Sequence, residues 1–318
     1  HYACLGCQMI PMDDEIGKKS IVNDVGPRDG LQNQQKILTP ADRAALVRAL
    51  LDAGMRHVEV GAFVSEKAVP AMAGTGEVLA ALGQHLLKDK VLTVLVPNVR
   101  GYELAVEAGA NSVCMVLYGS DSMAEANVRM NRQKAESAAM EIMGRARQQG
   151  VRVNCTIAVA FECPFEGRVD PGLVFDIAAR FLEHGVDELC VADTIGAVDP
   201  LRVRKLTARL VDELGSGRLS CHFHDTRAMG LANVFAALES GIRKFDASIA
   251  GLGGCPFAPG ASGNVATEDV VMMLEQTGFA TGIDLDSLMR ASELAQKLTG
   301  TAPGGRASAW LHQQRTKT

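Results

Sequence analysis

The segment Leu51-Asp-Ala-Gly54-Met-Arg-His-Val-Glu-Val60 passes from a helical pattern, through one glycine, into an apolar run of strand type. The same phrase returns at four later glycines: Gly109, Gly150, Gly185 and Gly241. Glycine is favoured where a helix ends in a left-handed residue. The apolar and β-branched residues that follow each glycine favour a strand. The repeated phrase therefore predicts a chain that alternates helices with strands.

Outward from this phrase, the apolar runs predict eight strands, at about 20–25, 56–60, 91–96, 111–117, 151–158, 187–192, 219–224 and 243–248. A helical stretch follows each of them, and the first helix is expected to begin near Thr39-Pro40, a capping residue and a first-turn proline. Eight such units in sequence predict an α/β fold, a (β/α)8 TIM barrel. A doubly wound open sheet is the alternative. An additional amphipathic helix is expected at 284–299.

The domain organisation follows from the same pattern. We expect a single catalytic barrel over residues 20–300, because no linker or low-complexity segment divides it. Residues 1–19 form an N-terminal extension that is either partly ordered or foreign to the natural protein. Residues 301–318 form a tail that begins with glycines and is expected to be loosely ordered, with Trp310 as an anchor for part of it.

Composition excludes several classes of function. The chain has 318 residues, 47% of them hydrophobic and 22% charged, and a formal net charge of −5. This balance argues against nucleic acid as a partner, and no apolar run is long enough to predict a membrane span. Residues 1–15 do not resemble a secretory signal. We therefore expect a cytoplasmic protein.

The cysteines fit a reducing compartment. There are 8 of them, scattered along the chain, which gives no disulfide framework. Four fall inside strand-like runs and are interpreted as small core residues: Cys114, Cys155, Cys190 and Cys221. The Cys4 and Cys7 pair is at most half of a zinc site and is interpreted as incidental.

Polar residues stand where the predicted strands end, and this is the edge at which TIM barrels carry their chemistry. His222 and His224 lie two apart on strand seven, so their side chains point to the same side and suit one metal ion. The other strand-end groups are Arg28, Asp29, Glu59, Asp193 and Asp246. For Asp193 a helix cap is the simpler interpretation, and for Arg28 with Asp29 a surface ion pair.

Two imidazoles with one carboxylate leave several coordination positions open. Nitrogen and oxygen donors without a thiolate favour Mg²⁺ or Mn²⁺, with Zn²⁺ or Co²⁺ as alternatives. Open positions suit a substrate that chelates through two oxygens, and the metal lowers the pKa of a bound hydroxyl.

The glycine-rich segment 251–269 follows strand eight and is expected to form a loop over the barrel mouth. It contains Cys255, a thiol in a setting that suits an acid or base able to move onto a substrate. A buried structural thiol is the alternative there, and it is the favoured interpretation for Cys163. Asn264 is either a helix cap or a fourth protein ligand to a hard metal ion.

These pieces resemble the 3-hydroxy-3-methylglutaryl-CoA lyase family. The matching motifs are Val25-Gly-Pro-Arg-Asp-Gly-Leu-Gln-Asn33, Val58-Glu-Val-Gly-Ala-Phe-Val-Ser65, Cys163-Pro-Phe-Glu-Gly167, Asp193-Thr-Ile-Gly196, His222-Phe-His-Asp-Thr226 and the 251–269 loop. The loop is the most specific of them. The Arg-Asp and His-x-His pieces are shared with isopropylmalate synthase and its relatives.

The resemblance implies a divalent-cation-dependent acyl-CoA lyase that releases acetyl-CoA and a keto acid by retro-Claisen cleavage. Arg28 would stabilise negative charge, Cys255 would protonate the leaving enolate, and His222 would share in proton transfer. Glu59 and Asp193 would orient groups or exchange protons, and Glu268 would support the loop. The implied metal ligands are Asp29, His222, His224 and Asn264. The residues offered for cofactor binding are Gln32 and Arg227.

The chain departs from the family pattern around the acyl pocket. Arg227 stands where an aromatic residue is expected, Ala62 where a small hydroxyl residue is usual, and Phe161-Glu162 where Leu-Gly is expected. These changes put the acyl substrate in question more than the reaction. Arg227 would pair with a substrate carboxylate or with coenzyme A phosphates. The family's cysteine near the C-terminus is missing, so thiol regulation is not expected.

Two other functions remain open at this level: a Claisen-type synthase of the same superfamily, and a catalytically silent binding barrel. The chain ends soon after the barrel, which argues against the extra C-terminal domains of such synthases. The expected partner is an acyl-CoA substrate, and a homodimer is the expected assembly.

Overall fold

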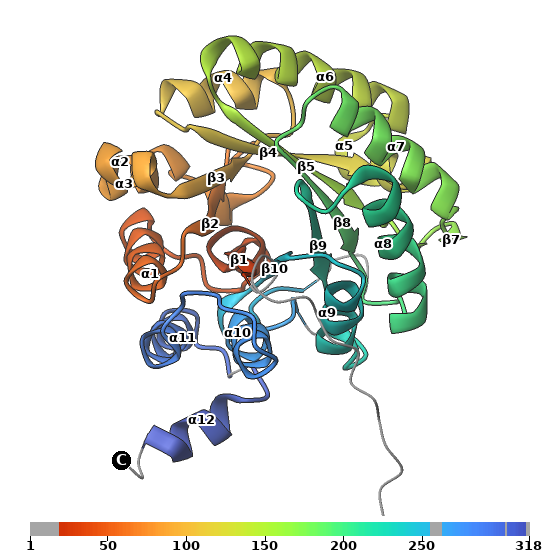
Figure 1. Cartoon of the computed structure of the whole chain (residues 1–318). Helices are drawn as coiled ribbons and strands as arrows, with labels where there is room; N and C mark the ends of the chain where they lie inside the picture. Colours follow the sequence, from red (N-terminus) through yellow and green to blue (C-terminus); the bar gives the residue numbers. More distant parts are fainter. Residues whose placement is uncertain (1–18, 255–262, 303, 316–318) are drawn as a thin grey trace, which may run out of the picture.

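A closed barrel of eight parallel strands forms the centre of the molecule (Figure 1). The computed structural model describes residues 19–254, 263–302 and 304–315. The barrel strands are β1 (Ile21–Asp24), β2 (His57–Ala62), β3 (Val91–Leu95), β4 (Ser112–Tyr118), β5 (Arg152–Ala158), β8 (Glu188–Asp193), β9 (Leu219–Phe223) and β10 (Lys244–Ala247). Since β1 pairs with both β2 and β10, the barrel closes, which confirms the predicted fold and rules out the open sheet.

Helices surround the barrel on the outside (Figure 1). They are α1 (Pro40–Asp52), α2 (Thr75–Leu82), α3 (Gln84–Asp89), α4 (Val99–Glu107), α5 (Asp121–Val128), α6 (Arg132–Gln149), α7 (Pro171–Glu183), α8 (Pro200–Leu214), α9 (Gly230–Glu239), α10 (Thr267–Gln276), α11 (Leu285–Thr299) and α12 (Ser308–Arg315). Short turns of helix lie at η1 (Gly26–Gly30), η2 (Pro70–Met72) and η3 (Ile249–Gly251), and β6 (Glu162–Cys163) pairs with β7 (Gly167–Arg168) in a small hairpin.

The predicted helix–strand junctions are present. Helix α1 begins where the sequence indicates, with Thr39 as its cap, Pro40 in the first turn, and a reciprocal bond to Asp42. All five junction glycines have positive φ. At Gly54 a side chain is also excluded by space, because a Cβ there would lie 2.5 Å from the Gly282 carbonyl oxygen.

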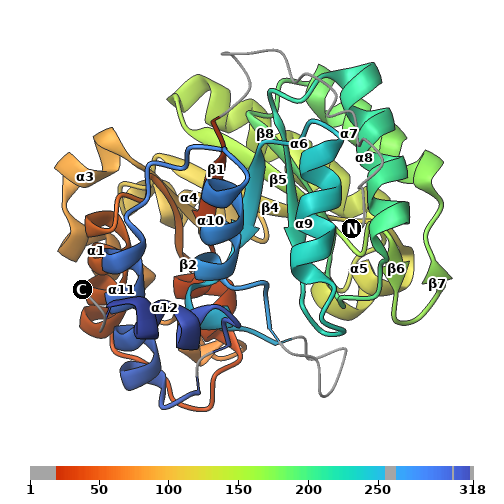
Figure 2. The same ribbon diagram turned by 60° about the horizontal axis from the view of Figure 1, so that its bottom comes forward.

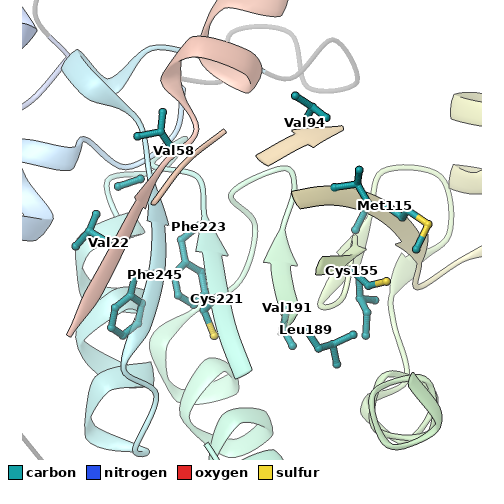
Figure 3. Packing of buried hydrophobic residues seen from close by; sticks show 14 of the residues in the cluster. Val22, Val58, Val94, Met115, Cys155, Leu189, Val191, Cys221, Phe223 and Phe245 are labelled. Atoms are coloured by element: carbon teal, nitrogen blue, oxygen red, sulfur yellow. The ribbon is translucent and has the colours of Figure 1, made fainter. Parts of the chain in front are cut away.

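The hydrophobic core lies between the strands and the helices, not on the barrel axis. Figure 3 shows members of this layer, among them Val22, Val58, Val94, Cys221 and Phe245. The side chains that alternate with them along the strands point inward and are mostly polar, as side-chain alternation along a strand requires. The barrel interior is therefore a polar compartment enclosed in an apolar shell.

The C-terminal helices pack on the outside of the barrel, α11 against α1 and α12 against α11. Helix α11 is the predicted additional helix, and Asp284 caps it. Residues 308–315, placed in a loose tail by the sequence, form helix α12 beside α11 (Figure 2). The expected anchor, Trp310, is half exposed, whereas Leu311 is buried against Met289 of α11. In the part of the chain that the structure describes, no helix has the length and apolarity needed to cross a membrane.

Candidate metal centre and active site

Two imidazoles lie together at the C-terminal end of β9. Their ring centroids are 5.2 Å apart, with an interplanar angle of 46°. His222 belongs to the strand, and His224 forms an isolated bridge with Asn264, which brings the segment after β10 against the strand end. The backbone thus joins two segments that are about forty residues apart in sequence.

Asp29 completes the cluster from the opposite end of the chain. It lies in η1, the turn directly after β1, and one ligand atom from each of Asp29, His222 and His224 lies within 4.8 Å of the others. No other group of this kind is found among the described residues. The three side chains are therefore close enough to bind one cation.

The bonding of Asn264 shows that a cation fits. Its Nδ2 donates to Asp29 Oδ2 at 2.8 Å and to the Leu252 carbonyl at 3.1 Å. Its Oδ1 is buried without a partner, and so is His224 Nδ1, within the described chain. A buried acceptor without a donor is costly, and a bound dication would satisfy Oδ1. Asn264 is not a helix cap, because Ala266 holds that position for α10.

His222 is held in a defined orientation by Asp246 on the neighbouring strand. Its Nδ1 lies 3.1 Å from Asp246 Oδ2, and Asn23 Nδ2 donates to Asp246 Oδ1 at 2.8 Å. A carboxylate on one ring nitrogen leaves the other for a metal, which is a common arrangement in metalloproteins. Burial lowers the pKa of His222, but Asp246 outweighs burial and raises it.

Arg28 links the metal cluster to β2. Its guanidinium makes two bonds to the Glu59 carboxylate, at 2.7 and 3.0 Å, and one to Asp29 Oδ1 at 2.8 Å. Gln32 Nε2 also donates to Asp29 Oδ1, at 3.1 Å. Arg28 and Asp29 are only 13% and 14% exposed, so they are not the surface pair that the sequence left open.

The electrostatics keep Asp29 ionised and His224 neutral, which are the charge states that a metal site needs. Burial alone would raise the pKa of Asp29, but Arg28 and the nearby imidazoles hold it at about 2. Burial, together with His222, lowers the pKa of His224 to about 4, which keeps that ring neutral and free to bind a metal. Burial raises the pKa of Glu59 although Arg28 opposes the shift.

A cavity of about 500 Å³ opens beside these groups. The predicted site residues that line it are Arg28, Asp29, Gln32, Glu59, His222 and His224. It continues past β4 to the inner faces of α5 and α6. The site therefore has both a cluster of reactive groups and room for a substrate, as expected of a barrel enzyme.

The family model described as HMGL-like matches residues 19–295. The chain belongs to the HMGL-like family. It is 41% identical over 291 residues to the hydroxymethylglutaryl-CoA lyase of Pseudomonas mevalonii, an alignment that covers 91% of this chain and 96% of the relative. It is equally 41% identical, over 278 residues, to the (R)-citramalyl-CoA lyase of Chloroflexus aurantiacus, covering 85% and 88%.

One similar solved structure contains bound ligands. The HMG-CoA lyase from Acinetobacter baumannii, solved with coenzyme A and 3-methylmalate, shares 37% identity at a TM-score of 0.88, covering 93% of this chain and 96% of that one. The resemblance to the HMG-CoA lyase family is thus confirmed for nearly the whole barrel.

Three described site residues predicted for this HMGL-like chain lie outside the cavity lining: Asn264, which bonds to Asp29, and the pair Asp193 and Arg227. The Asp193 carboxylate accepts bonds from the Ala197 and Val198 amides, at 3.0 and 3.2 Å. Arg227 is exposed and donates to the carbonyls of Gly196 and Ala197. Both side chains brace the loop between β8 and α8, so their catalytic and cofactor-binding roles stay predictions.

The structure separates the four strand cysteines into two pairs, whereas the sequence interpretation placed all four in the core. Cys155 and Cys221 belong to the core, as predicted. Cys114 and Cys190 are buried but line the cavity, so they face inward, and burial raises both pKa values far above the ordinary thiol value. The alternation of side chains along each strand could have indicated the inward direction of Cys114 and Cys190, but their apolar character favoured the core interpretation.

The two loop cysteines differ in what the structure describes. Cys163 is buried and accepts a hydrogen bond from the Ser120 hydroxyl at 3.0 Å, in line with its structural interpretation. Cys255 lies outside the described residues. The residue before it, Gly254, lines the cavity and accepts a bond from Asn33 Nδ2 at 3.2 Å.

Glu268 is fully buried behind the loop after β10. Its carboxylate accepts bonds from the Ala250 amide at 3.1 Å and from the Ser292 hydroxyl at 3.0 Å, joining η3 to α11. Burial raises the pKa of this carboxyl to about 7. The pKa of Glu268 is lower in the unfolded chain, near 4.5, than in the folded protein. The contribution of Glu268 to the free energy of unfolding is therefore fully present below pH 4.5 and is lost as pH rises through 7.

In the wild type, Glu268 should make the free energy of unfolding fall between pH 5 and 8 by on the order of 2–3 kcal/mol. We expect Glu268→Gln to remove this part of the fall. Asp24, whose pKa burial raises to about 6, retains part of the slope. Urea unfolding at several pH values measures the effect. Glu213→Gln on α8, an exposed ion-paired glutamate, is the control and should keep the wild-type slope. An unchanged slope in Glu268→Gln would contradict the prediction.

Proposed function

We propose that this chain is a divalent-cation-dependent acyl-CoA lyase. It cleaves 3-hydroxy-3-methylglutaryl-CoA or a related 3-hydroxyacyl-CoA to acetyl-CoA and a carbonyl product, which is a keto acid in the first case. The observation that carries the proposal is the meeting of Asp29, His222 and His224 with the Arg28–Glu59 pair in one cavity, with Asn264 bonded to Asp29 behind it. The HMG-CoA and citramalyl-CoA lyase activities of its relatives support the same reaction.

The reaction needs no co-reactant. A proton leaves the C3 hydroxyl, the C2–C3 bond breaks, and its electron pair forms the enolate of acetyl-CoA while C3 becomes a carbonyl. A proton then returns to C2. When bound, Mg²⁺ or Mn²⁺ supplies Lewis acidity that lowers the pKa of a hydroxyl.

The chain's own residues supply the other requirements. Arg28 keeps its charge at any working pH and presents a planar fork toward developing negative charge. Glu59 holds that fork in place through two hydrogen bonds. His222 is the proposed group that passes a proton, and Cys255, in the loop after β10, is the proposed acid that protonates C2.

Release of acetyl-CoA from HMG-CoA and from related 3-hydroxyacyl-CoA thioesters tests the proposal. Release should require Mg²⁺ or Mn²⁺ and stop on addition of a chelator. A preparation that cleaves no member of the panel would contradict the lyase assignment. Net condensation of acetyl-CoA with a keto acid would favour the synthase instead.

The loop cysteine gives a second test. Cys255→Ala should lower kcat by about 10²–10⁴-fold, the range for a lost general acid, while Mn²⁺ affinity stays at the wild-type value. Cys155→Ala, in the core and away from the cavity, is the matched control and should keep its activity. Full activity in Cys255→Ala would exclude the proposed proton donor.

A further inference from the structure

The cavity has an apolar arm that the reacting groups do not use. The arm begins at Cys114 on β4, which is close enough to Arg28 to interact with it electrostatically. It follows the inward side chains of β4 through Val116 to Tyr118. At about 3.3 Å per residue this is a path of roughly 13 Å. The arm's far wall is one face of α6, on which Ala135, Ala138, Ala139 and Ile142 recur at helical spacing. Small alanine side chains leave the space open.

Near the Tyr118 end of this arm polar side chains are already bonded to other protein groups, whereas Asn154 Oδ1, on the strand beside Cys114, is a buried acceptor without a partner among the described residues. Asn127 Nδ2 donates to the Tyr118 hydroxyl at 2.9 Å, and the Asn98 side chain caps α4 by accepting from the Gly101 amide. Such pairs offer little to a charged or amide-bearing ligand. The arm therefore suits an uncharged, apolar group.

The cavity also lacks a cation available for a free carboxylate. Among the described lining residues Arg28 is the only arginine or lysine, and its charge is already balanced by the Glu59 and Asp29 carboxylates that it bonds. Deeper in the barrel, Lys244 is bound by Glu188, at 3.2 Å. Residues 255–262, of the loop after β10, contain no arginine or lysine. A substrate carboxylate beyond the reach of the bound dication would meet carboxylates and apolar walls.

We infer that the preferred substrate carries an uncharged alkyl chain on C3, seated in the arm of β4 and α6, where HMG-CoA carries a carboxymethyl group. The inference rests on the proposed lyase function and narrows its substrate class. Cleavage follows the same electron balance, and the released carbonyl compound is then an apolar ketone, or a keto acid whose carboxylate the cation itself holds.

Three thioesters test the substrate class. HMG-CoA and 3-hydroxy-3,5-dimethylhexanoyl-CoA have C3 substituents of nearly equal shape that differ in charge, and 3-hydroxy-3-methylbutanoyl-CoA is the short uncharged reference. We expect kcat/KM for the dimethylhexanoyl thioester to exceed that for HMG-CoA at least tenfold. A higher value for HMG-CoA would overturn this inference and leave the lyase function intact. Cleavage of none of the three would instead contradict the lyase function.

A variant locates the alkyl chain. Ala138→Leu fills the arm from α6 and should lower kcat/KM for the dimethylhexanoyl thioester at least tenfold while sparing the methylbutanoyl thioester. Ser137→Leu, the next residue on the exposed side of the same helix, is the control and should change neither. An equal loss on both thioesters would place the pantetheine of coenzyme A in the arm and overturn the inference. If Ala138→Leu fails to fold, the wild-type comparison of the three thioesters still decides the question.

Discussion

Replacing Arg28 by lysine is expected to lower kcat by about 10²–10³-fold, the loss typical of removing one well-placed donor from developing negative charge. Lysine keeps the charge but not the fork. It cannot make the two bonds that Arg28 makes to Glu59 together with the third to Asp29. Steady-state kinetics on the best thioester of the panel measures the effect, and KM should change far less than kcat.

The control for this variant is Arg209→Lys on α8, whose guanidinium pairs with Glu213 at the surface. An exposed pair contributes little, so its activity and stability should stay close to wild type. Mn²⁺ binding by Arg28→Lys, measured by calorimetry, separates lost catalysis from a collapsed site. If kcat remained within a few-fold of wild type, Arg28 would not be the group that stabilises the charge.

Removing the carboxylate of the metal cluster should have the second large effect. Asp29→Asn is expected to weaken Mn²⁺ binding by more than the 10–100-fold that loss of an outer-sphere partner typically costs, and to abolish cation-dependent turnover. The reason is that Asp29 is the only carboxylate in the cluster, and Arg28 and the imidazoles keep it ionised. Isothermal titration calorimetry with Mn²⁺ measures the affinity.

Asp246→Asn gives the graded comparison. It leaves every proposed ligand in place but disturbs the bond that orients His222, so its loss of Mn²⁺ affinity should fall within about 10–100-fold. Asp187→Asn, at the opposite end of β8, is the control and should bind as wild type does. Equal affinities for Asp29→Asn and wild type would show that the cation, if bound, lies elsewhere.

Much of the site was predictable because strand ends have a known meaning in this fold. Once eight helix–strand units were recognised, His222, His224, Glu59 and Asp29 had to gather at one mouth. The residues alone left alternatives open for Asn264 and Cys255, and the family resemblance implies a metal ligand and a proton donor at these positions. The sequence left open whether Asn264 capped a helix, and its unsatisfied Oδ1 was visible only in the structure.

The misassignments of two cysteines, Cys114 and Cys190, share one physical cause. In a strand buried on both sides, apolar composition does not reveal which face points to the barrel axis. Cys114 and Cys190 were therefore interpreted as core residues, although they line the cavity. The role of Asp246 as the partner of His222 depends in the same way on the register of β10 against β9, which is set by closure of the whole barrel.

The sequence by itself determined the number and order of the βα units, the ends of the strands and the reactive side chains carried there, since these follow from local pattern and short motifs. Only the tertiary structure decided which face of each strand looks inward, which polar atoms are left without partners, and where the apolar arm lies between β4 and α6. Those features depend on contacts between segments far apart in the chain, and such contacts leave no local trace in the order of residues.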